Sequence, residues 1–334
     1  MKIPYVKTLG SKSSQFIEIK MIKFLFLFFI IFSACSRNKA KLRPLPEFKK
    51  ENYSYQQNKP LEGVFCFIGD AGHGKPSQFL VGKALAKERC ENIWYVGDII
   101  YPDGLKNVDD PLFISNFQKP YEPVISQKNF KQFHLALGNH DHRGNSDVWA
   151  DLTKKYNYIM APHWYFVEQW SNACFFVFDT DMYLRWEYDH RSLQNEWAKH
   201  KLETMKNCPV TVAVLHHPYI SSGGHGDATG PLKKFHEDFL VGHFDLVVAG
   251  HEHFLSDEGV YQETRLLISG AGSESRLRIR HPYQKGYEGN TIGFIKATLQ
   301  EKKLTYQFIE VSEEKGEPVT KVAETKVIQA QGLR

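Results

Sequence analysis

Short apolar runs recur along the chain from Gly63 onward, and each run ends at a polar residue. The runs are residues 64–68, 93–96, 133–137, 210–215 and 246–249. Because the apolar residues are continuous rather than alternating with polar ones, the runs predict strands that are buried on both faces of a sheet.

Several of the intervening stretches have the pattern of helices. They are residues 79–90, 193–205 and 231–241, the last of which has Pro231 at its start. The alternation of strands with helices predicts a layered α/β domain.

The polar residues that end the apolar runs are of kinds that bind metals. They are Asp70, Asp98, Asn139 with His140, His216, and His251 with His253. In α/β sheets, ligands bind outside the carboxyl ends of the strands, so we expect these side chains to meet there. A site of carboxylates, imidazoles and an amide, joined by the phenol of Tyr101, suits first-row metals such as Fe, Zn or Mn. Asp98 has ligands before and after it in the chain, so it is the expected bridge between two ions.

This set of residues, in this order, resembles the metallophosphoesterase superfamily. Most members have a His two residues after the first Asp, but here that position is Gly72. Purple acid phosphatases replace the missing His with a Tyr, and Tyr101 stands at its place. The small tartrate-resistant type also has motifs matched by residues 138–145 and by residues 269–272. The likeness runs from about Gly63 to about Val311.

The resemblance implies a fold and a metal site. The fold is α/β, a layered β-sandwich core of two mixed sheets flanked by helices. One metal, Fe(III) in the family, would be bound by Asp70, Asp98, Tyr101 and His253. A second, divalent metal (Fe(II), Zn or Mn) would be bound by Asp98, Asn139, His216 and His251. The implied catalytic residues, which contact the phosphate or protonate the leaving group, are His140 and His225.

The implied activity is that of an acid phosphatase, in which a metal-activated hydroxide attacks a phosphate monoester. The substrates would be phosphorylated small molecules or phosphopeptides. A metal-dependent phosphodiesterase or nucleotide hydrolase is the alternative, because residues 179–192 are shorter than the family's loop over the site. A surface binding lipoprotein with a relic site is a lesser alternative.

Several neighbouring residues are open to more than one interpretation. The family places the metal ligand two residues before Pro218, which selects His216 over His217. We expect no ligand role for His134 or His142. Asp141 would orient a ligand or a histidine by a hydrogen bond, or simply cap a turn. Glu252, where the small type has Asp, is expected to have little effect because the residue is not a ligand.

The N-terminus has the features of an export signal. Residues 24–32 are apolar, follow Lys23, and precede Ser33-Ala34-Cys35, which resembles a bacterial lipobox with Phe32 in place of the usual Leu. We therefore expect residues 1–35 to be a signal peptide, with Met21 as an alternative start. The mature protein would be lipid-anchored through Cys35 to a bacterial membrane, on its periplasmic or cell-surface side. This anchor would be its one contact with the membrane.

The remaining sequence is divided by its composition. Residues 36–60 are polar and predict a flexible tether, residues 61–312 predict the catalytic domain, and residues 313–334 predict a loose polar tail. The net charge of +4 comes without a clustered block of Lys and Arg, which argues against a nucleic-acid partner. We expect a monomer. Cys66, Cys90, Cys174 and Cys208 lie in or beside apolar runs, which favours buried small residues.

Overall fold

The computed structural model describes residues 53–185, 188–281 and 286–334. The predicted signal peptide, the lipobox-like Cys35 and most of the tether lie outside these residues. Within them, no helix combines the length and the apolar character needed to cross a membrane. The predicted tether, residues 36–60, extends too far along the chain. Within it, Ser54–Gln56 forms strand β1, which pairs in parallel with β6 (Phe166–Gln169). Such a short strand leaves no recognisable pattern in the sequence.

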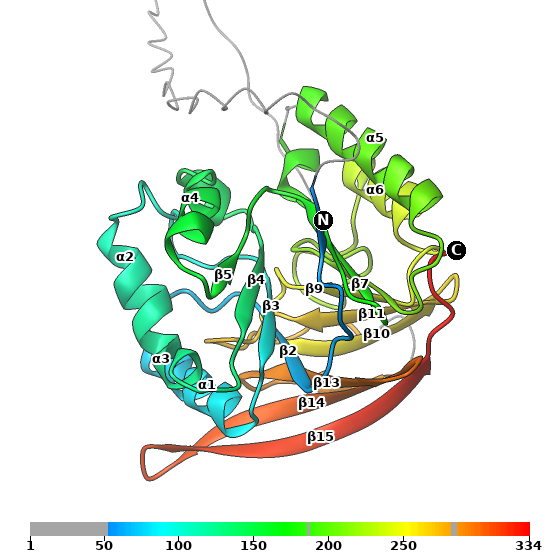
Figure 1. The fold of residues 1–334 in the computed structure, drawn as a ribbon. Coiled ribbons are helices and arrows are strands. Elements are labelled where there is room, and N and C mark those ends of the chain that lie inside the picture. The colour runs from blue at the N-terminus through cyan, green and yellow to red at the C-terminus, as the bar shows by residue number, and fades with distance from the viewer. Residues whose placement is uncertain (1–52, 186–187, 282–285) are drawn as a thin grey trace, which may run out of the picture. The chain divides into compact units, whose positions relative to one another are not determined.

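Two mixed sheets form the centre of the described domain (Figure 1). In one sheet the strand order is β1, β6, β7 (Cys174–Val177), β8 (Thr211–Val214), β9 (Leu246–Ala249), β11 (Thr264–Ser269), β10 (Leu255–Tyr261) and β12 (Glu288–Gly289). In the other it is β15 (Glu317–Gln329), β14 (Lys303–Glu314), β13 (Gly293–Gln300), β2 (Val64–Ile68), β3 (Asn92–Val96), β4 (Gln132–Ala136) and β5 (Ile159–Met160). Strands β2, β3 and β4 are parallel neighbours, as are β7, β8 and β9.

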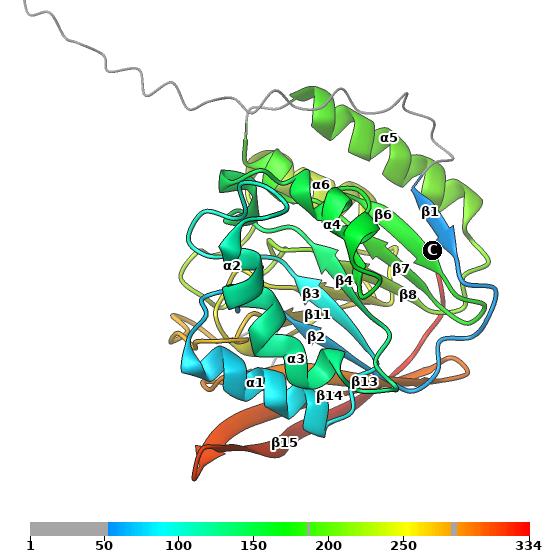
Figure 2. The same ribbon diagram turned by 60° about the vertical axis from the view of Figure 1, so that its left-hand side comes forward.

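Helices cover the outer face of each sheet (Figures 1 and 2). On the side of β2–β4 they are α1 (Pro76–Lys87), α2 (Pro111–Phe113), a π-helical turn (Ile114–Gln118), α3 (Lys119–Ile125) and α4 (Val148–Lys155). On the side of β7 and β8 they are α5 (Tyr188–Thr204) and α6 (Gly230–Phe239). Single 3₁₀ turns form at Asp141–Arg143 and Asp181–Tyr183. This helix–sheet–sheet–helix layering is the predicted fold.

Alternate residues of the central strands pack into different cores. Phe65 and Phe67 of β2 lie in the core between the sheets, where both rings contact Phe175 of β7. Cys66 and Ile68 of the same strand lie in the core beneath the helices. Because both faces of the strand are buried, the apolar run has no polar interruption.

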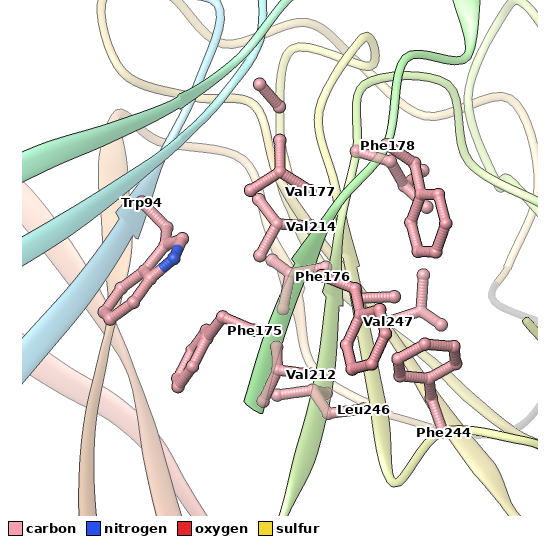
Figure 3. Close-up of a cluster of buried hydrophobic side chains, with 14 of the residues drawn as sticks. Trp94, Phe175, Phe176, Val177, Phe178, Val212, Val214, Phe244, Leu246 and Val247 are labelled. Atoms are coloured by element: carbon pink, nitrogen blue, oxygen red, sulfur yellow. The ribbon is translucent and has the colours of Figure 1, made fainter. Parts of the chain in front are cut away.

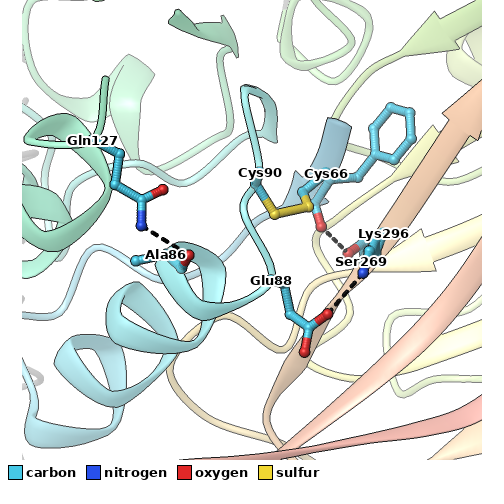
Figure 4. The surroundings of a disulfide bond; sticks show 8 residues. Cys66, Ala86, Glu88, Cys90, Gln127, Ser269 and Lys296 are labelled. Carbon is cyan, nitrogen blue, oxygen red and sulfur yellow. Dashed lines mark hydrogen bonds and ion pairs between the residues drawn. A yellow bond between two sulfur atoms is a disulfide. The ribbon is translucent and has the colours of Figure 1, made fainter. Parts of the chain in front are cut away.

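The four cysteines of the domain are paired, which corrects the prediction of buried small residues. Cys66 is disulfide-bonded to Cys90, with a Cα–Cα distance of 5.8 Å (Figure 4). Cys174 is disulfide-bonded to Cys208, with a Cα–Cα distance of 5.9 Å. Their burial was predicted correctly. The pairing depends on tertiary contacts across 24 and 34 residues, which sequence spacing does not show.

The prediction of a loose C-terminal tail at residues 313–334 is also wrong, because most of these residues form a strand. Strand β14 runs to Glu314, and β15 pairs antiparallel with it along its whole length. A two-residue turn, Glu301 and Lys302, joins β13 to β14. Because β15 is an edge strand with many solvent-exposed side chains, its sequence is polar although its backbone is ordered in a sheet.

Candidate metal centre

The seven predicted metal ligands come together at the carboxyl ends of the central strands. Asp70, Asp98, His216 and His251 each lie two residues beyond the end of a strand. Asp70, Asp98 and His251 have left-handed backbones, with φ of 54°, 54° and 69°. Residues other than glycine rarely adopt this conformation, and such strain concentrates at functional sites.

One group of ligand atoms surrounds the hydroxyl of Tyr101. Its oxygen lies 2.9 Å from Asp98 Oδ2, to which it can donate its one proton, 3.3 Å from Asp70 Oδ1 and 3.2 Å from His253 Nε2. Burial, and then the nearby carboxylates, raise the pKa of Tyr101 far above its usual value. Burial, reinforced by Asp98, also raises the pKa of Asp70.

A second group surrounds the ring of His216. Its Nε2 lies 3.2 Å from Asn139 Oδ1, 3.3 Å from His251 Nδ1 and 3.4 Å from Asp98 Oδ1. Asp98 therefore contributes one carboxylate oxygen to each group. Burial alone would lower the pKa of His216, but Asp98, Asp70 and the carbonyl of Val96 together raise that pKa to about 10.

These two groups fit a pair of cations. Asp70 and Asp98 are buried carboxylates side by side, and positive charge between them would offset their mutual repulsion. Nitrogen and oxygen donors without thiolates suit first-row metals. Asp70, Asp98 and His216 also offer atoms within 4.8 Å of one another, as do His216, His217 and His251.

Two glycines make this close assembly of side chains possible. A Cβ on Gly97, whose φ is +91°, would lie 2.4 Å from His216 Nδ1. A Cβ on Gly138 would lie 2.2 Å from Asp98 Oδ1. Gly97 and Gly138, which precede Asp98 and Asn139, are thus required because a larger residue would collide with another loop of the site.

Hydrogen bonds from groups outside the predicted ligand set orient the imidazole rings of the site. His216 Nδ1 lies 2.9 Å from the carbonyl of Val96, which leaves Nε2 free to bind a metal. His253 Nδ1 lies 3.0 Å from Glu274 Oε1. Sequence reasoning missed Glu274, because no motif marks it. His217 Nδ1 instead lies 2.9 Å from Thr180 Oγ1.

Asp141 joins two of the ligand-bearing loops by accepting hydrogen bonds from their backbones. This favours the turn-capping interpretation over the orientation of a ligand or a histidine side chain. The buried carboxylate accepts hydrogen bonds from the backbone N–H groups of Ile99, Ile100 and Gly138, at 2.9–3.2 Å. Burial and the charge of Asp98 raise its pKa to about 7. Its role is to hold the loop after β3 against the loop after β4.

The two predicted catalytic histidines lie at the edge of the site. His140 Nε2 lies 3.9 Å from Asp98 Oδ2, and its backbone N–H donates to Asp98 Oδ1 at 2.9 Å. The ring of His225 lies 4.2 Å from that of His251, between centroids. Their side chains are 21% and 48% exposed, so both are open to a substrate.

The histidines predicted to have no ligand role are paired with buried carboxylates. His134 Nδ1 contacts the carboxylate of Glu168, and His134 Nε2 lies 3.2 Å from Asn92 Oδ1. His142 Nε2 lies 2.8 Å from Asp179 Oδ2. The second pair connects the loop after β4 to the short segment that follows β7.

The His142–Asp179 pair predicts a pH dependence of stability. Burial would lower the pKa of His142, but Asp179, with a smaller contribution from Asp181, raises that pKa to about 9, against 6.5 ordinarily. A folded-state pKa above the unfolded value means full stabilisation below about pH 6.5, lost as the pH rises through 9. We expect the difference in Tm between wild type and His142→Gln to narrow from pH 6.5 to 9. A difference in Tm that stays constant between pH 6.5 and pH 9 would contradict the stabilising role of this ion pair.

Comparisons with known proteins agree with this geometry. The model of the calcineurin-like phosphoesterases matches residues 64–255, more than half of the chain. The chain is 28% identical to Purple acid phosphatase 7 of Arabidopsis thaliana, over 79% of this chain and 88% of that protein. It is 25% identical to Tartrate-resistant acid phosphatase type 5 of Sus scrofa, over 74% and 83%.

Among solved structures, the fold is similar to that of GAP50, described as the anchor in the inner membrane complex of Plasmodium. The TM-score is 0.65 at 21% sequence identity, over 81% of this chain and 90% of that chain. At this identity the similarity concerns the fold alone.

Proposed function

Because the chain belongs to the calcineurin-like phosphoesterases, as a purple acid phosphatase-like metal-dependent phosphatase, we propose that it hydrolyses phosphate monoesters at a dinuclear, iron-containing centre. The observation that supports this most directly is the position of Asp98. Its two oxygens lie in separate ligand groups, each completed by side chains from other loops.

The donor atoms favour different metals in the two positions. Two carboxylates, a phenol and one imidazole suit Fe(III), which prefers oxygen ligands. They belong to Asp70, Asp98, Tyr101 and His253. The second group has two imidazoles, an amide and a carboxylate, from His216, His251, Asn139 and Asp98. This group suits Fe(II), Zn or Mn.

The residues at the mouth of the site would assist the reaction. When bound, the two cations supply positive charge and a hydroxide nucleophile for displacement at phosphorus. His140, held against Asp98, would donate a hydrogen bond to a phosphate oxygen and stabilise its charge in the transition state. His225 would give a proton to the departing alcohol, a contribution typically worth about 10²–10⁴ in rate.

Replacing Tyr101 by phenylalanine tests the assignment of iron. A phenolate bound to Fe(III) gives the family its colour, so we expect purified wild-type protein to have a visible absorption band that Tyr101→Phe lacks. Iron content is measured in parallel. Tyr95→Phe, a change at another buried tyrosine of the same segment, should keep the band. A band unchanged in Tyr101→Phe would refute the ligand assignment.

A metal-dependent phosphodiesterase or nucleotide hydrolase remains the second candidate, favoured by the short segment after β7. Rates on p-nitrophenyl phosphate and bis-p-nitrophenyl phosphate distinguish the two. A strong preference for the diester would replace the first proposal. A relic site on a binding protein is opposed by the presence of all seven ligand side chains, and turnover abolished by Asn139→Ala would dismiss it.

We also propose that the catalytic domain acts as an exported monomer, lipid-anchored through Cys35. The motif Ser33-Ala34-Cys35 after an apolar run supports this. Cys35→Ser should move the protein from the membrane fraction to the soluble fraction. Retention in the membrane fraction by that variant would count against the lipid anchor.

A further inference from the structure

A buried carboxylate joins the proposed proton donor to the metal-binding segment. Glu252 lies between His251 and His253, and is only 4% exposed. Its Oε1 accepts hydrogen bonds from the backbone N–H of His225 at 2.9 Å and from Ser221 Oγ at 2.8 Å. Its Oε2 lies 3.2 Å from His225 Nδ1. One side chain thus contacts both the backbone and the ring of His225.

We propose that Glu252 is a positioning residue, which orients His225 to protonate poor leaving groups and so extends the substrates to phosphate monoesters of alkyl alcohols. This inference rests on the proposed function. It differs from the expectation that Glu252, as a residue outside the ligand set, has little effect.

The contact with Glu252 determines which nitrogen of His225 is available. A side chain that is 48% exposed would otherwise sample several rotamers. With Nδ1 held by Glu252, Nε2 is the nitrogen left for the substrate. The ring also packs against that of His251, which is bonded through its backbone N–H to Asp70. The proton donor is thereby held at a defined place relative to the metal ligands.

The loop that carries His225 is shaped around this carboxylate. A Cβ on Gly223 would lie 2.1 Å from Glu252 Oε2, so only glycine leaves room for it. The N–H of Gly223 donates to Ser221 Oγ, which itself donates to Glu252. Next to it, a Cβ on Gly224 would meet nothing within 4 Å. The close fit is therefore specific to the position facing Glu252.

The chemistry of the leaving group gives this arrangement a measurable role. As hydroxide forms the new P–O bond, the P–O bond to the ester oxygen breaks, and that oxygen leaves with the electron pair. An alkyl alkoxide is strongly basic and needs the proton from His225 Nε2 as it leaves, whereas p-nitrophenolate is stable without one. Loss of the positioned donor should therefore slow alkyl esters selectively.

The test compares glycerol phosphate with p-nitrophenyl phosphate in metal-loaded enzyme. Glu252→Gln keeps an acceptor for Ser221 and the His225 backbone, but can place an NH₂ group opposite Nδ1. We expect it to lower kcat for glycerol phosphate about 10- to 100-fold, and for p-nitrophenyl phosphate less than about threefold. Glu258→Gln is the matched control. Glu258 accepts two hydrogen bonds from Ser222 of the same loop. Its replacement should leave the ratio of the two rates unchanged.

A second pair of variants keeps the test decisive if Glu252→Gln does not fold. Gly223→Ala should displace the carboxylate and reproduce the selective loss, whereas Gly224→Ala should not. In a His225→Ala background, Glu252→Gln should have no further effect on glycerol phosphate hydrolysis. Metal content is measured for every variant, since Glu252 lies between two ligands.

Each outcome supports or refutes a specific claim. Equal losses on both esters, or a further loss in the His225→Ala background, would overturn the positioning role alone. Failure of wild-type enzyme to hydrolyse either ester would overturn the proposed function, and the positioning role with it.

Discussion

Replacing Asp98 by asparagine is expected to lower kcat/KM by at least about a thousandfold, equivalent to roughly 4 kcal/mol of transition-state stabilisation. Its two oxygens face separate ligand groups, at 2.9 Å from Tyr101 Oη and 3.4 Å from His216 Nε2. The amide of asparagine removes the negative charge that both cations share. Metal analysis should therefore show less than two equivalents of metal, together with the loss of turnover.

A buried carboxylate outside the site provides the control for Asp98→Asn. Asp257 is fully buried and lies 3.1 Å from Arg265 Nη1 and 2.8 Å from Lys326 Nζ. Asp257→Asn should reduce stability but keep the metal content and the kcat of the folded enzyme. If Asp98→Asn retains both metals and normal turnover, Asp98 does not bridge a metal pair.

Replacing Phe175 by alanine is expected to lower the free energy of unfolding by about 3–5 kcal/mol. Figure 3 shows Phe175 projecting from β7 toward Trp94 of the opposite sheet. The two rings stack at a centroid distance of 3.9 Å, and Phe65 packs edge-on at 5.7 Å. Truncation leaves a cavity between two sheets, which cannot move together without disturbing both. Urea unfolding of the metal-loaded protein measures the change.

The matched control for Phe175→Ala is a phenylalanine at the surface. Phe79 of α1 is 38% exposed, and its replacement by alanine should change the unfolding free energy by less than about 1 kcal/mol. Similar losses for both variants would show that the core between the sheets does not dominate stability.

The central strands were predicted well because burial on both faces leaves a simple sequence pattern. The run 64–68 coincides with β2, and 246–249 with β9. Helix 193–205 was placed within one residue of the end of α5, although that helix begins earlier, at Tyr188. The strand ends carried the proposed ligands because parallel strands deliver their following residues to one edge of a sheet.

Features that depend on the tertiary fold could not be predicted in this way. Glu274 meets His253, and Glu252 meets His225, only because distant loops fold against each other. Strand β15 escaped prediction for a different reason. It lies at the edge of its sheet, so its polar residues resemble those of a tail.

The two disulfides make the stability of this enzyme depend on the redox state of its surroundings. Each closes a loop of a few tens of residues, which restricts the unfolded chain and stabilises the fold by roughly 3–4 kcal/mol. One of them ties β2, the strand leading to Asp70, to the segment after α1. In a cytosol that keeps thiols reduced, the fold would lack this contribution to its stability. Its full resistance to unfolding would arise only where thiols are oxidised.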